Sequence, residues 1–294
     1  MRIFICLLLL GVMFLLYVGV ENRMLIVRRY KISTDNFSSQ ESIKIVQISD
    51  IHKRKYSNGW SRFVMRVKEL SPDMIFITGD LVSRTETSLE STQILLEKLC
   101  LICPVYCSKG NHELDLSAEM MEKYHKMMKN AGAVFLENDS TVFEKDGRKI
   151  NIYGTDLKKS VYKNENGGYA ALDRITSAEL TQSLGDAKEG FNILLAHNPF
   201  FFEEYAKWGA DLTFSGHVHG GAVYVPFIGG ILSPERNFFP KYTKGLYKKD
   251  SQYMLVSTGI GKLRVFNPPE ILYAELFLKL SLIHISEPTR HAQI

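Results

Sequence analysis

The stretch IKIVQISDIH, residues 43–52, joins a run of β-branched apolar residues to two polar side chains placed two positions apart. Such a run is typical of a buried strand, and Asp50 and His52 follow at its end. Four further strands of the same kind are expected at 74–78, 104–108, 191–197 and 210–216. Because helical patterns separate the earlier strands and the last third is rich in β patterns, the sequence predicts an α/β layered domain.

Each expected strand runs into residues that can bind a metal. In chain order they are Asp50, His52, Asp80, Asn111, His112, His197, His217 and His219. Open α/β sheets gather functional residues beyond the carboxyl ends of their strands, so we expect these five loops to meet in one cleft. Of the eight histidines, two lie within 280–294, and five of the remaining six stand at these strand ends. Isolated surface or core histidines do not explain such a concentration.

The chemistry of this set favours two divalent metal ions as cofactors. Imidazole, carboxylate and amide oxygen ligands suit Mn, Fe or Zn, and the set contains no thiolate. One carboxylate can bridge two cations about 4 Å apart, which acidifies a water to hydroxide and neutralises charge on phosphoryl oxygens. Gly79, Gly110 and Gly216 stand beside the expected ligands and allow the backbone to approach the site closely.

The order D-x-H, G-D, G-N-H-E, H and G-H-x-H resembles that of the calcineurin-like metallophosphoesterase superfamily. The match extends from Ile43 to about Ile271, and IVQISDIH, GHVHGG, STGIG and FNPPEI resemble its small membrane-anchored bacterial members. The resemblance implies a four-layer αββα sandwich with a dinuclear site at one edge. It departs in small ways: Glu113 stands where Asp is commoner, and Lys53 and Arg54 add positive charge. These two residues are either phosphate contacts or, as we expect, solvated loop residues.

The resemblance also implies a role for each residue of the site. One metal would be held by Asp50, His52, Asp80 and His219. The other metal would be held by Asp80, Asn111, His197 and His217. Asp80 would therefore bridge the two ions, and His112 would be catalytic, either as a general acid or as a stabiliser of the transition state.

The first residues have a different composition from the rest. IFICLLLLGVMFLLYVGV, residues 3–20, is long enough to span a hydrocarbon core and carries no charge. No A-x-A-like cleavage site follows, so we expect a single-pass anchor in the cell membrane, with a cleaved signal peptide as the alternative. Basic residues are more numerous after this stretch than before it, which favours a cytoplasmic body, but anchors of secreted hydrolases often have the opposite orientation. The side of the membrane stays open.

We expect four segments: an anchor at 1–22, a juxtamembrane segment at 23–40, the metallophosphoesterase domain at 41–279 and a tail at 280–294. The tail begins with LSLIHISEPTR, which matches the in-frame translation of a transposase-based sequencing adapter. We therefore expect it to be non-native and leave it out of the fold and the site. Within the domain, the polar stretch 159–174 is expected to form a loop or flap beside the cleft.

These expectations favour an enzyme that hydrolyses a phosphodiester or pyrophosphate bond by metal-activated hydroxide. The anchor suggests a membrane-associated substrate, and a lipid-linked pyrophosphate is one option by analogy with relatives that cleave a nucleotide-linked glycolipid precursor. A net charge of +4 without a long basic run argues against a nucleic-acid partner. The alternative is a membrane-tethered binding protein that keeps the metals without turnover. No expected ligand is missing and His112 is present, which favours the enzyme.

Overall fold

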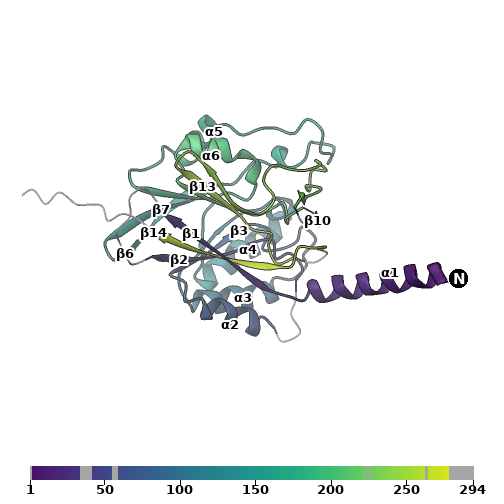
Figure 1. Ribbon diagram of the computed structural model, residues 1–294. Helices are drawn as coiled ribbons and strands as arrows, with labels where there is room; N and C mark the ends of the chain where they lie inside the picture. Colours follow the sequence, from purple (N-terminus) through teal and green to yellow (C-terminus); the bar gives the residue numbers. More distant parts are fainter. Residues whose placement is uncertain are drawn as a thin grey trace, which may run out of the picture.

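Two six-stranded sheets stack face to face at the centre of the molecule, and helices cover both outer faces (Figure 1). The computed structural model describes residues 2–33, 42–54, 59–221, 223–225, 227–261 and 264–277. The expected tail at 280–294 lies outside the described residues. This architecture confirms the predicted four-layer αββα sandwich.

The first sheet is mostly parallel and carries the first five strands of the chain together with the last one. Its order is β1 (Ile26–Ser33), β14 (Glu270–Phe277), β2 (Ile43–Ile48), β3 (Met74–Thr78), β4 (Val105–Ser108) and β5 (Val134–Phe135). The order of the second sheet is β12 (Gly245–Lys249), β13 (Gln252–Val256), β9 (Leu212–Ser215), β8 (Phe191–Leu195), β7 (Arg148–Gly154) and β6 (Asp139–Lys145). A small hairpin of β10 (Tyr224–Val225) and β11 (Gly229–Gly230) lies outside both sheets.

The core between the sheets follows from the two-residue period of the strands. In β2, Ile43 and Ile45 pack toward the second sheet, whereas Val46 and Ile48 pack toward the helices. Gln47 is a buried polar exception, because its Nε2 donates to Thr78 Oγ1 at 2.7 Å and to the carbonyl of Ser215 at 2.8 Å. These bonds join β2 and β3 to β9, so the strand ends of the two sheets are held together at one edge.

The outer layers bury the apolar faces of amphipathic helices. The helices α2 (Ser61–Glu69), α3 (Glu90–Cys100) and α4 (Ala118–Ala131) cover the first sheet. The second sheet is covered by α5 (Ser177–Leu184) and α6 (Phe202–Trp208). Short 3₁₀ turns occur at η1 (Glu113–Asp115), η2 (Lys159–Val161) and η3 (Pro199–Phe201). The helical patterns expected from the sequence near 60–70, 86–99, 117–130 and 177–184 correspond to α2 to α5.

The segment that was expected to be juxtamembrane contains β1, an edge strand of the first sheet. It pairs in parallel with β14, with Ile26 opposite Glu270 and Ser33 opposite Phe277. Arg29 and Lys31 are exposed while Tyr30 and Ile32 pack inward, so the strand has the alternation of a half-buried edge. From the sequence alone, the basic residues of this segment resemble charges that flank an anchor, so the alternation of a strand is not recognised.

The N-terminal helix α1 (Arg2–Glu21) extends away from the body (Figure 1). By length and composition alone, Ile3–Glu21 can cross a membrane, and none of its most apolar window is buried. A signal sequence near the N-terminus has the same properties. The structure therefore has one apolar N-terminal helix of the expected kind, and its membrane role remains a proposal.

Candidate metal centre

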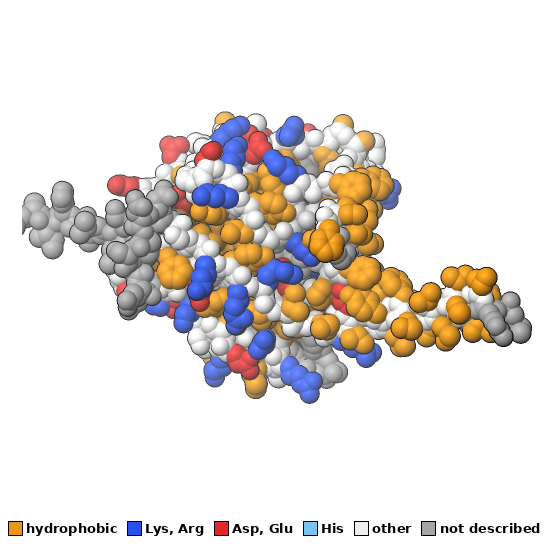
Figure 2. Space-filling view, viewed as in Figure 1, with side chains coloured by type: hydrophobic (Ala, Val, Ile, Leu, Met, Phe, Trp, Pro, Cys, Tyr) orange, Lys and Arg blue, Asp and Glu red, His pale blue; other side chains and the backbone are white. Residues whose placement is uncertain are grey.

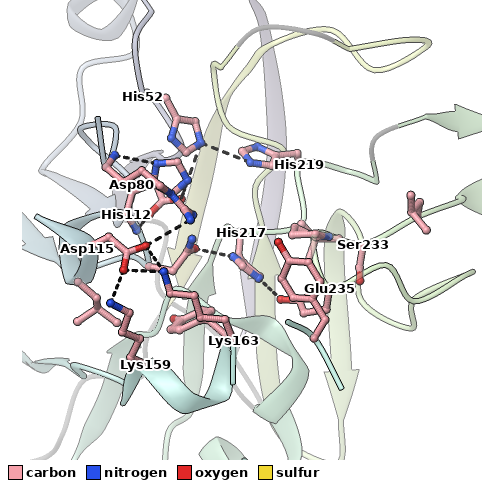
Figure 3. Close-up of a pocket in the computed structure, with 18 of the residues that line it drawn as sticks. His52, Asp80, His112, Asp115, Lys159, Lys163, His217, His219, Ser233 and Glu235 are labelled. Atoms are coloured by element: carbon pink, nitrogen blue, oxygen red, sulfur yellow. Dashed lines mark hydrogen bonds and ion pairs between the residues drawn. The ribbon is translucent and has the colours of Figure 1, made fainter. Parts of the chain in front are cut away.

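The eight residues predicted for the site converge at one edge of the sandwich, in the loops that follow five parallel strands. Asp50 and His52 follow β2, Asp80 follows β3, Asn111 and His112 follow β4, His197 follows β8, and His217 and His219 follow β9. Six of them line a cavity of about 300 Å³, while Asp50 and His197 are fully buried next to it (Figure 3). The structure thus brings together the whole predicted set.

The backbone at these strand ends is strained. Positive φ angles between 50° and 70° occur at Asp50, His52, Asp80, His217 and His219. Residues other than glycine rarely adopt positive φ angles, although Asp and His tolerate them better than most. Backbone strain of this kind is typical of functional sites. Hydrogen bonds hold the turns: the amide of Asp50 donates to the carbonyl of Gly79, and that of His52 donates to the carbonyl of Asp80.

One group of ligand atoms surrounds the side of the cavity nearest His52 and His219. Their Nε2 atoms lie 3.4 Å apart, so two ring nitrogens converge on one point. His219 Nε2 is 3.8 Å from Asp50 Oδ1, and His52 Nε2 is 3.8 Å from Asp80 Oδ2. Asp50, His52 and His219 offer ligand atoms that all lie within 4.8 Å of one another, a group that can hold a metal ion.

His197 marks a second group in the fully buried floor of the site. Its Nδ1 donates to the carbonyl of Thr78 at 2.7 Å, so Nε2 faces Asp80 Oδ2 at 3.4 Å and Asp50 Oδ1 at 3.9 Å. Among the described residues, this buried Nε2 has no hydrogen-bond partner. Burial lowers the pKa of His197, but Asp80 and Asp50 outweigh it and raise the pKa to about 10. The carboxylates thus favour a positive charge at this point, which fits a bound cation.

Asp80 lies between the two groups, as a bridging ligand requires. Its Oδ2 is 3.4 Å from His197 Nε2 and 3.8 Å from His52 Nε2. Burial on its own would raise the pKa of Asp80, but His197, followed by His52 and His112, holds the pKa well below its usual value. The side chain is therefore an anion, surrounded by ligand atoms from both sheets.

His217 and Asn111 lie side by side, and Glu235 contacts the far side of the His217 ring. His217 Nδ1 lies 2.9 Å from Asn111 Oδ1, and its Nε2 donates to the buried carboxylate of Glu235 (Figure 3). When Nε2 alone carries the proton, the ring presents its Nδ1 lone pair beside the side-chain oxygen of Asn111. Two acceptors at this distance suit a cation between them, so these residues also fit a metal.

His112 reaches the cavity from the other side of Asp80. The amide of Arg84 donates to His112 Nδ1 at 3.2 Å, so the neutral ring carries its proton on Nε2, which lies 3.9 Å from Asp80 Oδ2. Burial and the neighbouring His52 and Arg84 lower the pKa of His112 to about 4, against the opposing effect of Asp80. The ring is thus a neutral hydrogen-bond donor at the edge of the site.

Comparison with known proteins places this geometry in a family. The family profile described as calcineurin-like phosphoesterase matches residues 43–221. The uncharacterized metallophosphoesterase YkuE of Bacillus subtilis is 30% identical over 241 residues, which cover 79% of this chain and 78% of that protein. The chain belongs to the calcineurin-like phosphoesterase family. It is a metal-dependent phosphoric ester hydrolase, as predicted, and the Asp and His groups above can hold a dinuclear metal site.

Two further relatives carry names that specify a reaction. The phosphodiesterase YaeI of Escherichia coli is 27% identical over 247 residues, which cover 79% of this chain and 82% of that protein. The UDP-2,3-diacylglucosamine pyrophosphatase LpxG of Chlamydia muridarum is 24% identical over 292 residues, with 80% and 84% covered. This calcineurin-like phosphoesterase is thus similar to enzymes named for diester and for pyrophosphate bonds.

Glu113, the departure noted in the sequence, has a structural explanation in this phosphoesterase. The side chain is fully buried and accepts hydrogen bonds from the backbone amides of Asp80, Val82 and Gly110 at 2.8–3.1 Å. It therefore ties the loop after β3 to the loop after β4. Burial, followed by the charge of Asp80, raises the pKa of Glu113 to about 7.

The expectation that Arg54 is solvated is wrong. Arg54 is buried, and its guanidinium donates to the carbonyl of Asn22 at 2.7 Å, just beyond the end of α1. The exposed Lys53 agrees with the expectation. Arg54 thus connects the loop after β2 to the start of the domain and does not face the cavity.

A group of cations at the rim of the cavity was not identified from the sequence. Asp115 lies among Arg84, Lys159 and Lys163, with nitrogen–oxygen distances of 2.6–3.3 Å (Figure 3). Three cations around one carboxylate leave a net positive charge at the mouth of the site. Lys159 and Lys163 belong to the predicted flap, and Tyr162 between them packs its ring 5.1 Å from that of His217. The flap therefore does form one wall of the site.

Proposed function

We propose that this phosphoesterase uses two divalent metal ions to hydrolyse a phosphodiester or pyrophosphate bond in a membrane-associated substrate. The observation that carries the proposal is the position of Asp80, between two groups of ligand atoms that come from both sheets. One metal would be held by Asp50, His52, Asp80 and His219. The other would be held by Asp80, Asn111, His197 and His217. When bound, two such ions supply Lewis acidity toward phosphoryl oxygens and lower the pKa of a bound water.

The residues of the chain itself contribute binding and hydrogen bonding. His112 carries its proton on Nε2 and donates a hydrogen bond to an oxygen of the reacting phosphate or of the leaving group. Arg84, Lys159 and Lys163 attract an anionic substrate to the mouth of the cavity, because Asp115 neutralises only one of their three charges. A substrate with two phosphates would use both the metal site and this rim.

Two observations support a membrane-associated substrate. The side chain of Asn22, just beyond α1, donates to the carbonyl of Arg264 at 2.9 Å and accepts from its amide at 3.1 Å. Arg264 in turn lines the cavity, and its guanidinium donates to the carbonyl of His219. If α1 spans the membrane, these bonds connect the end of the membrane-spanning helix directly to the cavity and so hold the cavity close to the membrane surface. The similarity to a protein named as a diacylglucosamine pyrophosphatase supports a lipid-linked pyrophosphate as the substrate class.

The alternative is a tethered metal-binding protein without turnover. Such a protein would keep the metal ligands but lack a hydrogen-bond donor next to the reacting phosphate. His112 is present at that position with its tautomer fixed by the amide of Arg84. We therefore favour the enzyme.

The test is hydrolysis of bis-p-nitrophenyl phosphate by the full chain in detergent, with Mn²⁺ added and then removed with EDTA. Asp80→Ala tests the bridge, and Asp250→Ala is its control, because Asp250 is exposed in the β12–β13 turn and has a similar φ of 52°. We expect turnover that both EDTA and Asp80→Ala abolish and that Asp250→Ala leaves unchanged. A folded, manganese-loaded protein without turnover on diester or pyrophosphate probes would favour the binding protein.

A further inference from the structure

Exposed aromatic and aliphatic side chains gather at the end of the molecule from which α1 emerges. Phe227 is fully exposed, and the exposed fractions of Ile228, Phe238 and Phe239 are 65%, 72% and 62%. Together with Phe266 we call these residues the aromatic rim. Figure 2 shows hydrophobic side chains continuing from this end of the body onto α1. Several large apolar side chains exposed in one place mark an interaction surface rather than ordinary surface variation.

Two loops present the aromatic rim: the turn between β10 and β11, and a second loop at 231–244 between β11 and β12. Backbone hydrogen bonds fix each of them. Phe227 and Ile228 form the turn between β10 and β11. The second loop closes on itself as a hairpin, because the amide of Phe239 donates to the carbonyl of Ile231 at 2.9 Å and Leu232 pairs with Phe238. The apolar side chains are thus presented outward by a fixed backbone, and the described residues of the chain do not cover them.

The aromatic rim contacts the apolar surface of α1 through Phe266. The ring of Phe266 lies 5.4 Å from that of Tyr17 and 6.2 Å from that of Phe14, both on α1. The amide of Phe266 also donates to the carboxylate of Glu21 at the end of α1. Phe266 therefore packs on α1, and the apolar side chains of the two loops lie at the same end of the body. A surface that joins a candidate membrane span in this way is more compatible with a lipid bilayer than with a second protein.

The flanking charges agree with a lipid surface as the occupant. Arg236 and Lys241 are exposed on either side of the phenylalanines in the second loop; Arg236 lies over the ring of Tyr169, and Lys241 also pairs with Glu203 at 3.0 Å. Aromatic rings next to basic side chains are typical of segments that lie in the interfacial layer, where the cations meet lipid phosphates.

The same loop forms part of the catalytic cavity. Leu232, Ser233, Pro234 and Glu235 line the cavity, and Phe238 and Phe239 follow within a few residues. We propose that the aromatic rim inserts into the interfacial layer of the bilayer beside α1 and holds the mouth of the cavity against the lipid surface. The insertion stands on the geometry of the rim, whereas its use for substrate capture rests on the proposed phosphoesterase function.

The insertion is tested with single tryptophans in the full chain, reconstituted in vesicles that contain anionic lipids and brominated acyl chains. The variants are Phe227→Trp and Phe238→Trp, with Val142→Trp as the control on β6, which lies at the far end of the body from α1 (Figure 1). The native Trp60 and Trp208 are buried and give a constant background. We expect a shift of emission to shorter wavelength and quenching at 227 and 238, and neither at 142.

Equal, weak quenching at all three positions would overturn the proposal. So would self-association that the Phe227→Ser variant removes without any quenching at 227, since the rim would then cover a second copy of the chain.

The use of the rim is tested with two probes that share one reaction, soluble bis-p-nitrophenyl phosphate and vesicle-borne hexadecyl p-nitrophenyl phosphate. The variant is Phe227→Ser combined with Ile228→Ser, because neither residue of this turn lines the cavity. We expect turnover of the vesicle-borne probe to fall about tenfold or more, as loss of one buried phenylalanine implies, with the soluble probe unchanged. Equal loss on both probes would overturn substrate capture by the rim. Quenching without turnover on either probe would keep the insertion and reject the proposed diester hydrolysis.

Discussion

The interior between the sheets and the edge where their strands end are built from the same strands but have opposite character. In the interior, Ile45, Phe76 and Phe214 are fully buried, and the rings of Phe76 and Phe214 meet edge to face at 5.0 Å. At the edge, Asp50 and His197 are equally buried but polar, and the backbone turns through positive φ angles. The difference indicates that close packing in the interior stabilises the fold and holds an edge that is unfavourable by itself.

Metal removal gives the largest expected effect, and it is confined to the edge. Chelation should lower turnover of bis-p-nitrophenyl phosphate about a thousandfold or more, since metal stabilisation of transition-state charge amounts to several kcal/mol. It should also lower the melting temperature, because bound cations stabilise the folded state through the buried carboxylates. The measurement is turnover and thermal unfolding with and without EDTA.

Asp80→Ala serves as the control for chelation, because a site without its bridge has less metal to lose. Its melting temperature should hardly respond to EDTA. A native protein whose turnover and melting temperature are both indifferent to EDTA would contradict the assignment of the edge as a metal site.

Phe76→Ala tests the interior. Removal of a buried phenylalanine should lower the free energy of unfolding by about 3–5 kcal/mol, through lost burial and the cavity left behind. At temperatures where the variant is still folded, its kcat should remain within about twofold of the native value, because no site residue changes. Chemical denaturation and turnover on the same preparation check both parts. A large loss of kcat in folded protein would show that interior and edge are not separable.

Gly110→Ala compares a glycine at the edge with one outside it. A Cβ on Gly110 would clash with both the carboxylate and the backbone nitrogen of Asp80, so the Asp80 side chain and its loop have to shift. Misplacement of a reacting group by about 1 Å can lower turnover about a hundredfold. Gly132→Ala is the matched control, because Gly132 ends α4 with a φ of 79° and a Cβ there has open space. That control should lose about 1 kcal/mol of stability and keep its turnover.

Sequence reasoning found the edge because its signal is local. A run such as IKIVQI ends in Asp50 and His52, and this pattern recurs at Asp80, His197 and His217. The other residues of the site carry no such signal. Glu235 lies 18 positions beyond its partner His217, in a loop without periodicity, so only the folded chain shows that the two are in contact. Arg84 and Asp115 are likewise ordinary loop residues until the loops are placed together.

Glu235→Gln sharpens the comparison of edge and interior, because it alters the hydrogen bond that orients His217 without removing His217 itself. The carboxylate accepts the Nε2 proton of His217 and so orients the ring, and loss of such an outer partner costs about 10–100-fold in metal affinity. We expect half-maximal turnover to require a higher manganese concentration than in the native protein, and much of kcat to return at high manganese concentration. Glu204→Gln is the control, since Glu204 accepts from the amide of Ser177 away from the site. An unchanged metal requirement would reduce Glu235 to a packing residue.

The smallest expected effect lies at the mouth of the cavity, where the charges of Lys159 and Lys163 around Asp115 are only partly buried. Lys159→Ala combined with Lys163→Ala should raise the KM several-fold and leave kcat nearly unchanged, because exposed ion pairs are worth up to about 1 kcal/mol. The difference from the native protein should shrink as ionic strength rises, since salt screens these charges. Lys158→Ala is the matched control, because that neighbour pairs instead with Glu179 and Asp173. A fall in kcat that salt does not alter would move these lysines from the rim into the catalytic edge, and the boundary drawn between substrate attraction and chemistry would have to move with them.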